Sequence, residues 1–298
     1  MQSAWQQESG KNDWKSTPMK YSMTDDPLQG ILPFVEQPSR YLGTEVNRVR
    51  KDFRDVKLKM VLAFPDLYEI GTSHLGLQIL YSILNAKKEV AAERVYAPDL
   101  DMERNLRSSG TPLMSLETHT PIRCFDIVGF SLLYELNYTS ILNILELSGI
   151  PFLSGERDES SPGPYPLIIG GGPCTCNPEP VSDLFDAMVV GDGESVIGQM
   201  AQAWIEWYEG GGRDKQALLK SWSKITGVYI PSFFRAHFSS EGFQSLFPKD
   251  PLYSKVTRAI VSDLNDAPFP DAPIVPFGRP VHDRLRLEVA RGCTRGCR

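Results

Sequence analysis

Apolar runs alternate with segments of helical spacing along the middle of the chain. Residues 57–65, KLKMVLAFP, alternate and then become wholly apolar, which is typical of a strand that ends at a proline. In residues 74–88, HLGLQILYSILNAKK, the apolar side chains recur every three or four positions, which is typical of a helix. This part of the chain therefore predicts a strand, a loop and a helix in succession.

The same succession continues as far as residue 212. The further predicted strands are residues 94–98, 125–133, 165–172 and 186–194. The further predicted helices are residues 100–110, 138–147 and 194–209, the last of which ends in a run of glycines. Largely apolar strands that alternate with helices indicate a parallel sheet with both faces covered, so we predict an α/β fold with a doubly wound parallel sheet.

The composition changes after this predicted domain. Short β-type runs occupy residues 225–262, and five prolines between 268 and 280 favour an extended, stiff crossing segment. The predicted organisation is a mobile extension (1–30), the α/β domain (31–212), a β-rich connecting segment (213–264), a proline-rich linker (265–284), and a buried strand that begins a second domain (285–298).

Composition and charge exclude several classes of protein. The chain has 298 residues, of which 41% are hydrophobic, and its 31 basic and 37 acidic side chains give a net charge of -6 without long runs of either sign. This argues against a general nucleic-acid or membrane-surface binder. No run of about 18 apolar residues and no apolar leader occurs, and five cysteines are an odd, unevenly spaced set. We therefore predict a cytoplasmic protein.

Candidate ligand-binding residues follow the predicted strands. In an open parallel sheet, ligands bind beyond the carboxyl ends of the strands, and glycines there allow a flat or phosphate-bearing ligand to approach the backbone. The candidates are Asp66, Tyr68, Gly71, Ser131, Leu133, Gly170, Gly171, Gly172, Gly191, Gly193 and Glu194. No Gly-x-Gly-x-x-Gly follows the first strand, which argues against a standard NAD site.

Structural interpretations of these residues stay open. The glycines at 170–172 also suit a tight turn, and Asp66 also suits a helix cap. Ser131 also fits a small residue at a crowded strand end, and Glu194 an exposed loop carboxylate. Cys124, Cys174 and Cys176 have no ligand spacing and are interpreted as packing or incidental thiols.

Cys293 and Cys297 are the candidate metal ligands. They are four residues apart, and Gly292 and Gly296 beside them would allow a loop to wrap closely around an iron–sulfur cluster. A zinc site or a thiol-redox site is the alternative. No Ser-His-Asp or Cys-His arrangement and no phosphate-binding loop of the GxxxxGK[ST] type can be placed.

The motifs resemble those of a known family. Asp66-x-Tyr68-x-x-Gly71, Ser131-x-Leu133 and Gly170-Gly171 resemble the Asp-x-His-x-x-Gly, Ser-x-Leu and Gly-Gly elements of cobalamin-binding domains. GGPCTCNPEP, VVGDGE, PDLYEIGTSHLGLQILYSILN and EVARGCTRGCR resemble an uncharacterised subfamily of radical S-adenosylmethionine (SAM) enzymes that carry such a domain at the N-terminus. The resemblance extends from about residue 32 to the end of the chain.

The resemblance implies a fold, cofactors and a reaction. The fold would be a Rossmann-like, cobalamin-binding sheet, a small β-rich connector and the first strand of a truncated radical SAM barrel. In that family Cys-x-x-x-Cys-x-x-Cys holds a four-iron, four-sulfur (4Fe–4S) cluster, and Cys293 and Cys297 match the first two positions. The third position lies two residues beyond Arg298, so the chain is expected to be cut inside the motif and inactive by itself.

The implied activity belongs to the full-length enzyme. The cluster would bind SAM and cleave it to a 5′-deoxyadenosyl radical, for methyl transfer or a radical rearrangement of an unknown substrate. A flavodoxin or ferredoxin would act as reductant, and cobalamin would be a further cofactor.

One position departs from the cobalamin motif. Tyr68 stands where the family has the histidine that binds cobalt, so cobalamin would lack a histidine ligand from this loop. His74 is interpreted as a residue at the start of a helix, facing solvent or the edge of the ligand. The alternative function is a non-catalytic ligand-binding or docking module with a degenerate cobalamin pocket.

Overall fold

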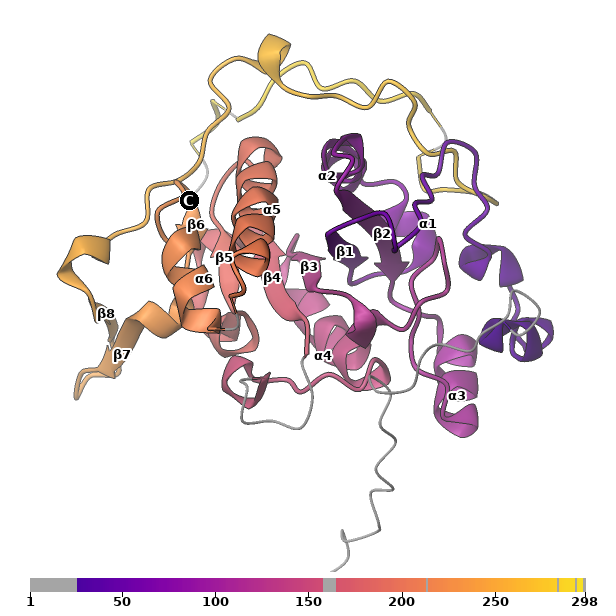
Figure 1. Cartoon of the computed structure of the whole chain (residues 1–298), viewed down its shortest axis with the longest axis horizontal. Coiled ribbons are helices and arrows are strands. Elements are labelled where there is room, and N and C mark those ends of the chain that lie inside the picture. The colour runs from indigo at the N-terminus through magenta and orange to yellow at the C-terminus, as the bar shows by residue number, and fades with distance from the viewer. Residues whose placement is uncertain (1–25, 158–164, 213, 283, 293, 297–298) are drawn as a thin grey trace, which may run out of the picture.

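The fold is built on a six-stranded sheet, shown in Figure 1. The computed structural model describes residues 26–157, 165–212, 214–282, 284–292 and 294–296. The strands of the sheet are β1 (Leu58–Phe64), β2 (Val90–Tyr96), β3 (Ile127–Ser131), β4 (Leu167–Gly171), β5 (Ala187–Val189) and β6 (Val228–Tyr229). A separate antiparallel hairpin contains β7 (Phe234–Phe238) and β8 (Gln244–Pro248).

The strand order is β2-β1-β3-β4-β5-β6, and the first five strands are parallel to their neighbours. The predicted α/β fold with a parallel sheet is therefore confirmed for these strands. β6 pairs antiparallel with β5, which the sequence did not predict. Two helices in succession separate β5 from β6, so the chain returns to the carboxyl end of the sheet before it enters β6.

Helices cover both faces of the sheet. They are α1 (Tyr68–Gly71), α2 (Leu75–Ala86), α3 (Leu100–Ser109), α4 (Tyr138–Leu147), α5 (Glu194–Glu209) and α6 (Lys215–Trp222). Met60 and Leu62 of β1 belong to the apolar core beneath α2 and α5, whereas Val61 and Ala63 belong to the core beneath α3 and α4. This alternation explains why β1 is apolar throughout, because both of its faces are buried.

Three local predictions differ from the structure. β2 begins at Val90, four residues before the predicted strand, and α6 was not predicted. The buried strand predicted from residue 285 is wrong for the described residues, because Leu285 is 77% exposed, Val289 is 89% exposed and no strand is formed there. A strand requires a hydrogen-bonded neighbour, and the described part of the chain offers none to this segment.

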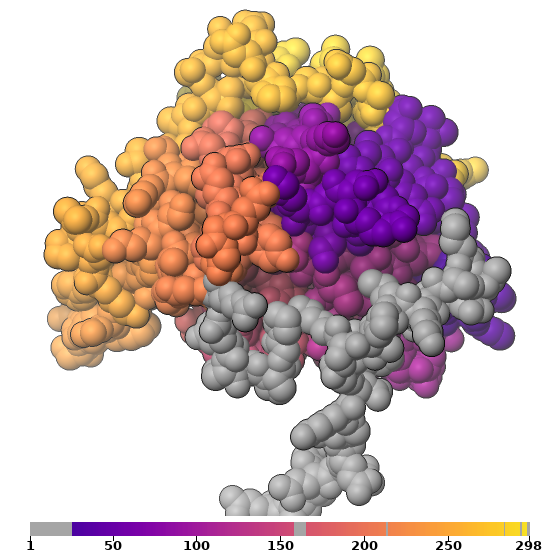
Figure 2. All heavy atoms as spheres, viewed as in Figure 1, coloured from indigo at the N-terminus to yellow at the C-terminus, as the bar shows by residue number. Residues whose placement is uncertain are grey.

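The carboxyl ends of the strands are covered by a segment that we call the strap, residues 259–282 and 284–286. Ala259 forms a bridge with Gly191, and the backbone N–H of Phe277 donates to the hydroxyl of Tyr68. Arg286 donates to the carbonyl oxygen of Ser73. Figures 1 and 2 show the strap in gold and yellow along one edge of the molecule. The proline-rich residues thus have the extended form that was expected, and they contact the sheet domain. The division into domains stays a prediction.

The N-terminal part of the described chain is folded. Pro27–Gly30 forms a turn of 3-10 helix, and Leu28 is buried against the core. These residues therefore belong to the folded domain rather than to the predicted extension, of which residues 1–25 lie outside the described residues. Within the described residues, no helix is long and apolar enough to cross a membrane.

Candidate functional site

A cavity of about 400 Å³ lies at the carboxyl ends of the strands, between α2 and α5. Its floor consists of strand residues that point to the α2/α5 face of the sheet. They are Met60 and Leu62 of β1, Gly129 and Ser131 of β3, Ile169 and Gly171 of β4, and Val189 of β5. The strand order reverses between β1 and β3, so the cavity lies at the topological switch point, where open α/β sheets bind ligands.

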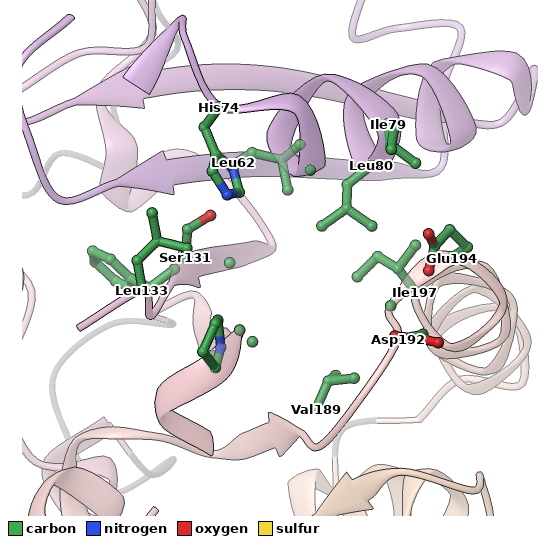
Figure 3. Close-up of a pocket in the computed structure, with 18 of the residues that line it drawn as sticks. Leu62, His74, Ile79, Leu80, Ser131, Leu133, Val189, Asp192, Glu194 and Ile197 are labelled. Carbon is green, nitrogen blue, oxygen red and sulfur yellow. The ribbon is translucent and has the colours of Figure 1, made fainter. Parts of the chain in front are cut away.

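The walls of the cavity are apolar, and its polar groups lie at the edges. Figure 3 shows Leu80 of α2 and Ile197 of α5 pointing toward one another on the side of the cavity where the two helices meet. Ser131 lies at the end of β3, and Asp192 and Glu194 lie where the chain enters α5. An apolar chamber with a few polar groups at its rim suits a flat, largely apolar ligand group.

The three glycines at the end of β4 and directly after it have different structural roles. A Cβ atom at Gly171 would meet only Val189, at 3.8 Å, so this glycine leaves space above the sheet. A Cβ atom at Gly170 would lie 2.8 Å from Leu132 and 2.9 Å from Phe185, in the opposite core. Gly172 has φ +125°, and a Cβ atom there would lie 2.6 Å from the carbonyl oxygen of Leu132. Gly171 therefore opens the cavity, whereas its two neighbours satisfy packing and backbone geometry.

The structure brings most of the predicted residues together. Those that line the cavity are Ser131, Leu133, Gly170, Gly171, Gly172, Gly191, Gly193 and Glu194. Those that are not among its lining residues are Asp66, Tyr68 and Gly71. Whether any of them binds a ligand stays a prediction.

The loop after β1 turns its side chains away from the cavity. Asp66 accepts hydrogen bonds from the hydroxyl of Tyr134 at 3.2 Å and from the side-chain amide of Asn137 at 3.4 Å. Tyr68 is buried, and its hydroxyl donates to Oε1 of Glu45 at 3.0 Å. Burial and the negative charge of Glu45 raise the pKa of Tyr68. A Cβ atom at Gly71 would lie 2.4 Å from the ring of Tyr96, so this glycine is required by packing.

His74 places an imidazole ring at the cavity. It is the N-cap of α2, where its Nδ1 accepts a hydrogen bond from the backbone N–H of Leu77 at 3.2 Å, and Figure 3 shows its ring pointing into the cavity. Burial, and secondarily the charge of Arg286, lower the pKa of His74, so the ring is neutral near pH 7. Because Nδ1 accepts, Nε2 carries the proton and can donate to a ligand. The interpretation of His74 as a helix-start residue at the cavity edge agrees with this position.

An arginine closes the charged end of the cavity. Arg291 forms ion pairs with Glu194, with Asp192 at 3.4 Å and with Glu288 at 2.7 Å. The hydrogen bonds to Glu288 and Glu194 raise the pKa of Arg291. Glu194 is thus neutralised by a residue of the C-terminal segment rather than left as an exposed loop carboxylate.

The cysteines give no metal site in the described residues. Cys293 and Cys297 lie outside the described residues, and within those residues no three His, Cys, Asp or Glu side chains are grouped to hold a metal ion. Cys174 is buried and hydrogen-bonds with Tyr138, and burial raises the pKa of its thiol. These contacts agree with the interpretation of Cys174 as a packing residue.

Sequence reasoning missed several residues of the cavity. Gly129 interrupts the apolar run of β3, and a glycine inside a strand signals a close approach, so it was a usable signal. Leu80 and Ile197 look like ordinary core positions of amphipathic helices. Arg291 and Glu288 follow the strap in the sequence and line the cavity, and no local sequence pattern predicts this position.

The comparisons with known proteins identify a family. The family described as radical SAM proteins, N-terminal, matches residues 76–231, which is more than half of the 298 residues and runs from α2 to just beyond β6. No curated protein and no solved structure matches the chain. The matched residues include β3, β4, β5 and α5, which form most of the cavity. The chain belongs to the N-terminal family of radical SAM proteins.

Proposed function

We propose that this chain is the ligand-binding N-terminal portion of an enzyme that cleaves SAM with the help of a 4Fe–4S cluster. The family membership supports the enzyme class. The spacing of Cys293 and Cys297 supports these residues as two of the cluster ligands. When bound, the cluster would supply the electron that breaks a carbon–sulfur bond of SAM. The electron would come from a reductant of the flavodoxin or ferredoxin type. The reaction would be methyl transfer to an unknown substrate or a radical rearrangement of it.

We propose further that the cavity takes the nucleotide end of a cobalamin-type corrinoid. The observation that carries this proposal is the apolar cavity at the switch point, over a floor that is left open where Gly171 has no side chain. A side chain at Gly171 would enter the space, so the floor fits a flat heteroaromatic ring. The Ser131-x-Leu133 motif borders the same space.

The residues of this chain would bind and orient such a ring. Leu80 and Ile197 would exclude water from the side where α2 meets α5, and the hydroxyl of Ser131 can accept or donate a hydrogen bond. Nε2 of His74 would donate a hydrogen bond. His74 is poorly suited to bind cobalt, because a free Nε2 lone pair would move the proton to Nδ1 and break the bond from Leu77.

The position of Tyr68 favours the alternative function, a non-catalytic ligand-binding or docking module with a degenerate corrinoid pocket. The residue at the place of the cobalt-binding histidine is buried, and Glu45 and Phe277 occupy its hydroxyl. Both functions share the same cavity, so binding and catalysis need separate experiments.

Binding is tested with the 298-residue chain and hydroxocobalamin, by following the visible absorption bands during a titration. Gly171→Leu fills the cavity and should raise the dissociation constant at least about tenfold, the equivalent of about 1.4 kcal/mol. Gly155→Leu is the matched control, because Gly155 is exposed and a Cβ atom there meets nothing within 4 Å. Unchanged bands at large ligand excess would reject the corrinoid and leave the docking module.

Catalysis is tested with the full-length protein after anaerobic assembly of the cluster. With SAM and dithionite, the protein should release 5′-deoxyadenosine, and Cys297→Ala should abolish the product. A sample loaded with iron and sulfide that gives no 5′-deoxyadenosine would reject the enzyme. A sample that contains zinc and no iron absorbance would support the alternative metal site at Cys293 and Cys297.

A further inference from the structure

One arginine joins the segment that carries the terminal cysteines to the rim of the cavity. Arg291 precedes Cys293 by two residues. Its Nη2 donates to Oε1 of Glu194, the first residue of α5, and its Nη1 lies 3.4 Å from Oδ2 of Asp192. Both carboxylates, and Arg291 itself, line the cavity. The segment that leads to the cysteines is therefore part of the cavity wall.

The guanidinium group is oriented within its own segment. Nε and Nη2 of Arg291 donate to Oε1 and Oε2 of Glu288, each at 2.7 Å. Such a two-pronged bond to a carboxylate fixes the plane of the guanidinium group. The remaining N–H groups then point toward the loop between β5 and α5, where Glu194 and Asp192 accept them.

The accepting loop is itself held in one position. Oδ2 of Asp192 accepts from the backbone N–H of Val261 at 2.7 Å, and the backbone N–H of Asp192 donates to the carbonyl oxygen of Ala259 at 3.0 Å. Gly191 has φ +102°, and a Cβ atom there would lie 2.1 Å from that same oxygen. Glu194 is only 8% exposed, at the N-terminus of α5, where the helix dipole favours a carboxylate. Arg291 therefore binds to a preformed acceptor.

We propose that Arg291 is a positioning residue that couples ligand binding in the cavity to the position of the cysteine segment. Two residues of extended chain span about 7 Å, so the ion pairs of Arg291 limit how far Cys293 can move from the cavity. A ligand in the cavity contacts the wall that Arg291 and Glu288 complete, and it stabilises that wall. Each event then strengthens the other, because coupling between two sites is reciprocal. The coupling, but not the ion-pair clamp itself, rests on the proposed corrinoid.

The clamp is tested without ligand, on the reduced 298-residue chain. The rate at which iodoacetamide alkylates Cys293 and Cys297 is measured by peptide mass spectrometry. Arg291→Met should raise this rate about five- to tenfold, the loss expected for charge-assisted hydrogen bonds. Arg279→Met is the matched control, an exposed arginine of the strap, and should leave the rate unchanged. Equal rates in the wild type and Arg291→Met would overturn the clamp.

A second variant distinguishes loss of the ion pair from unfolding of the protein. Glu194→Gln removes the negative charge of the acceptor instead of the donor and should raise the rate by a similar factor, while Arg291→Met with Glu194→Gln should add little to either single change. Full additivity of the two effects would overturn a direct interaction. Circular dichroism melting of each variant separates local release from global unfolding.

The coupling is tested with cyanocobalamin, whose upper ligand does not exchange readily with thiols. A saturating amount should slow alkylation about threefold or more in the wild type and leave the rate in Arg291→Met unchanged, a readout independent of activity. Equal slowing in both proteins would overturn the coupling. A wild type that binds no cyanocobalamin would reject the corrinoid and the coupling together, while the ligand-free rates still decide the clamp.

Discussion

The hydroxyl of Tyr68 donates a hydrogen bond to Oε1 of Glu45 at 3.0 Å, and both side chains are buried. Glu45 also pairs with the buried Arg94 at 3.1 Å. Tyr68 is thus part of an internal charged network that joins the N-terminal segment to β2. The structural role of Tyr68 has consequences for stability that can be measured.

Tyr68→Phe should lower the free energy of unfolding by about 1–3 kcal/mol, because Glu45 loses a buried donor and the N–H of Phe277 loses its acceptor. Urea denaturation followed by circular dichroism measures the change. Tyr208→Phe is the control, since Tyr208 is exposed on α5 and should change stability by less than about 0.5 kcal/mol. Equal midpoints for Tyr68→Phe and the wild type would contradict the network.

Glu93 should make the protein less stable as the pH rises. Burial, and secondarily the charge of Glu117, raise the pKa of Glu93 from 4.5 to about 7. The folded state then binds more protons than the unfolded state between these values, so the free energy of unfolding falls by about 3 kcal/mol from pH 4.5 to pH 7 through this group.

The comparison with Glu93→Gln isolates this effect. The variant should match the wild type near pH 4.5 and exceed its stability at pH 8, because glutamine does not ionise. Urea denaturation at each pH measures the difference, and the exposed Glu241→Gln serves as control. A constant difference between wild type and Glu93→Gln across this range would show that Glu93 does not titrate there.

Gly170 and Gly171 should respond in opposite ways to alanine. Gly170→Ala should destabilise the protein by about 1–3 kcal/mol, because the new methyl group would lie 2.8 Å from Leu132 and 2.9 Å from Phe185. Gly171→Ala should cost less than about 0.5 kcal/mol, because its methyl group meets only Val189 at 3.8 Å. Thermal unfolding of the two variants checks the order, and a larger loss for Gly171→Ala would refute this assignment of faces.

His74→Ala should lower stability by about 1 kcal/mol, because the N–H of Leu77 loses its cap. His74→Asn should retain most of the stability, since asparagine is among the best N-cap residues. The two variants separate the structural role of His74 from its place in the cavity. If both bind hydroxocobalamin as the wild type does, Nε2 of His74 makes no contact with that ligand.

The sequence predicted the elements whose apolar pattern is local. The alternation in β1 and the three- and four-residue spacing in α2 and α5 depend only on neighbouring positions, and these elements were placed within a few residues. β6 has two residues and α6 has eight, so both are shorter than the windows over which a strand or helix period can be recognised. Leu285, Leu287 and Val289 alternate as in a strand, yet pairing depends on a distant partner that the pattern cannot reveal.

The sequence predicted those residues of the cavity whose position follows from the end of a strand. Gly171, Gly191 and Ser131 could be placed together at the edge where the cavity lies, because they end or follow strands and the carboxyl ends of parallel strands share one edge. The direction of Tyr68 depends on Glu45 and Phe277, 23 and 209 residues away, and sequence spacing does not encode it. The same holds for Arg291 and Glu194, which are 97 residues apart.

The strap also sets an order of events during synthesis. Phe277 leaves the ribosome 209 residues after its partner Tyr68, a delay of about 10–40 s at 5–20 residues per second. During that interval β1 to β5 can already assemble, before the strap residues that bond to Tyr68 and Ser73 have been synthesised. The order of synthesis therefore allows the sheet to fold first and the strap to attach to it afterwards.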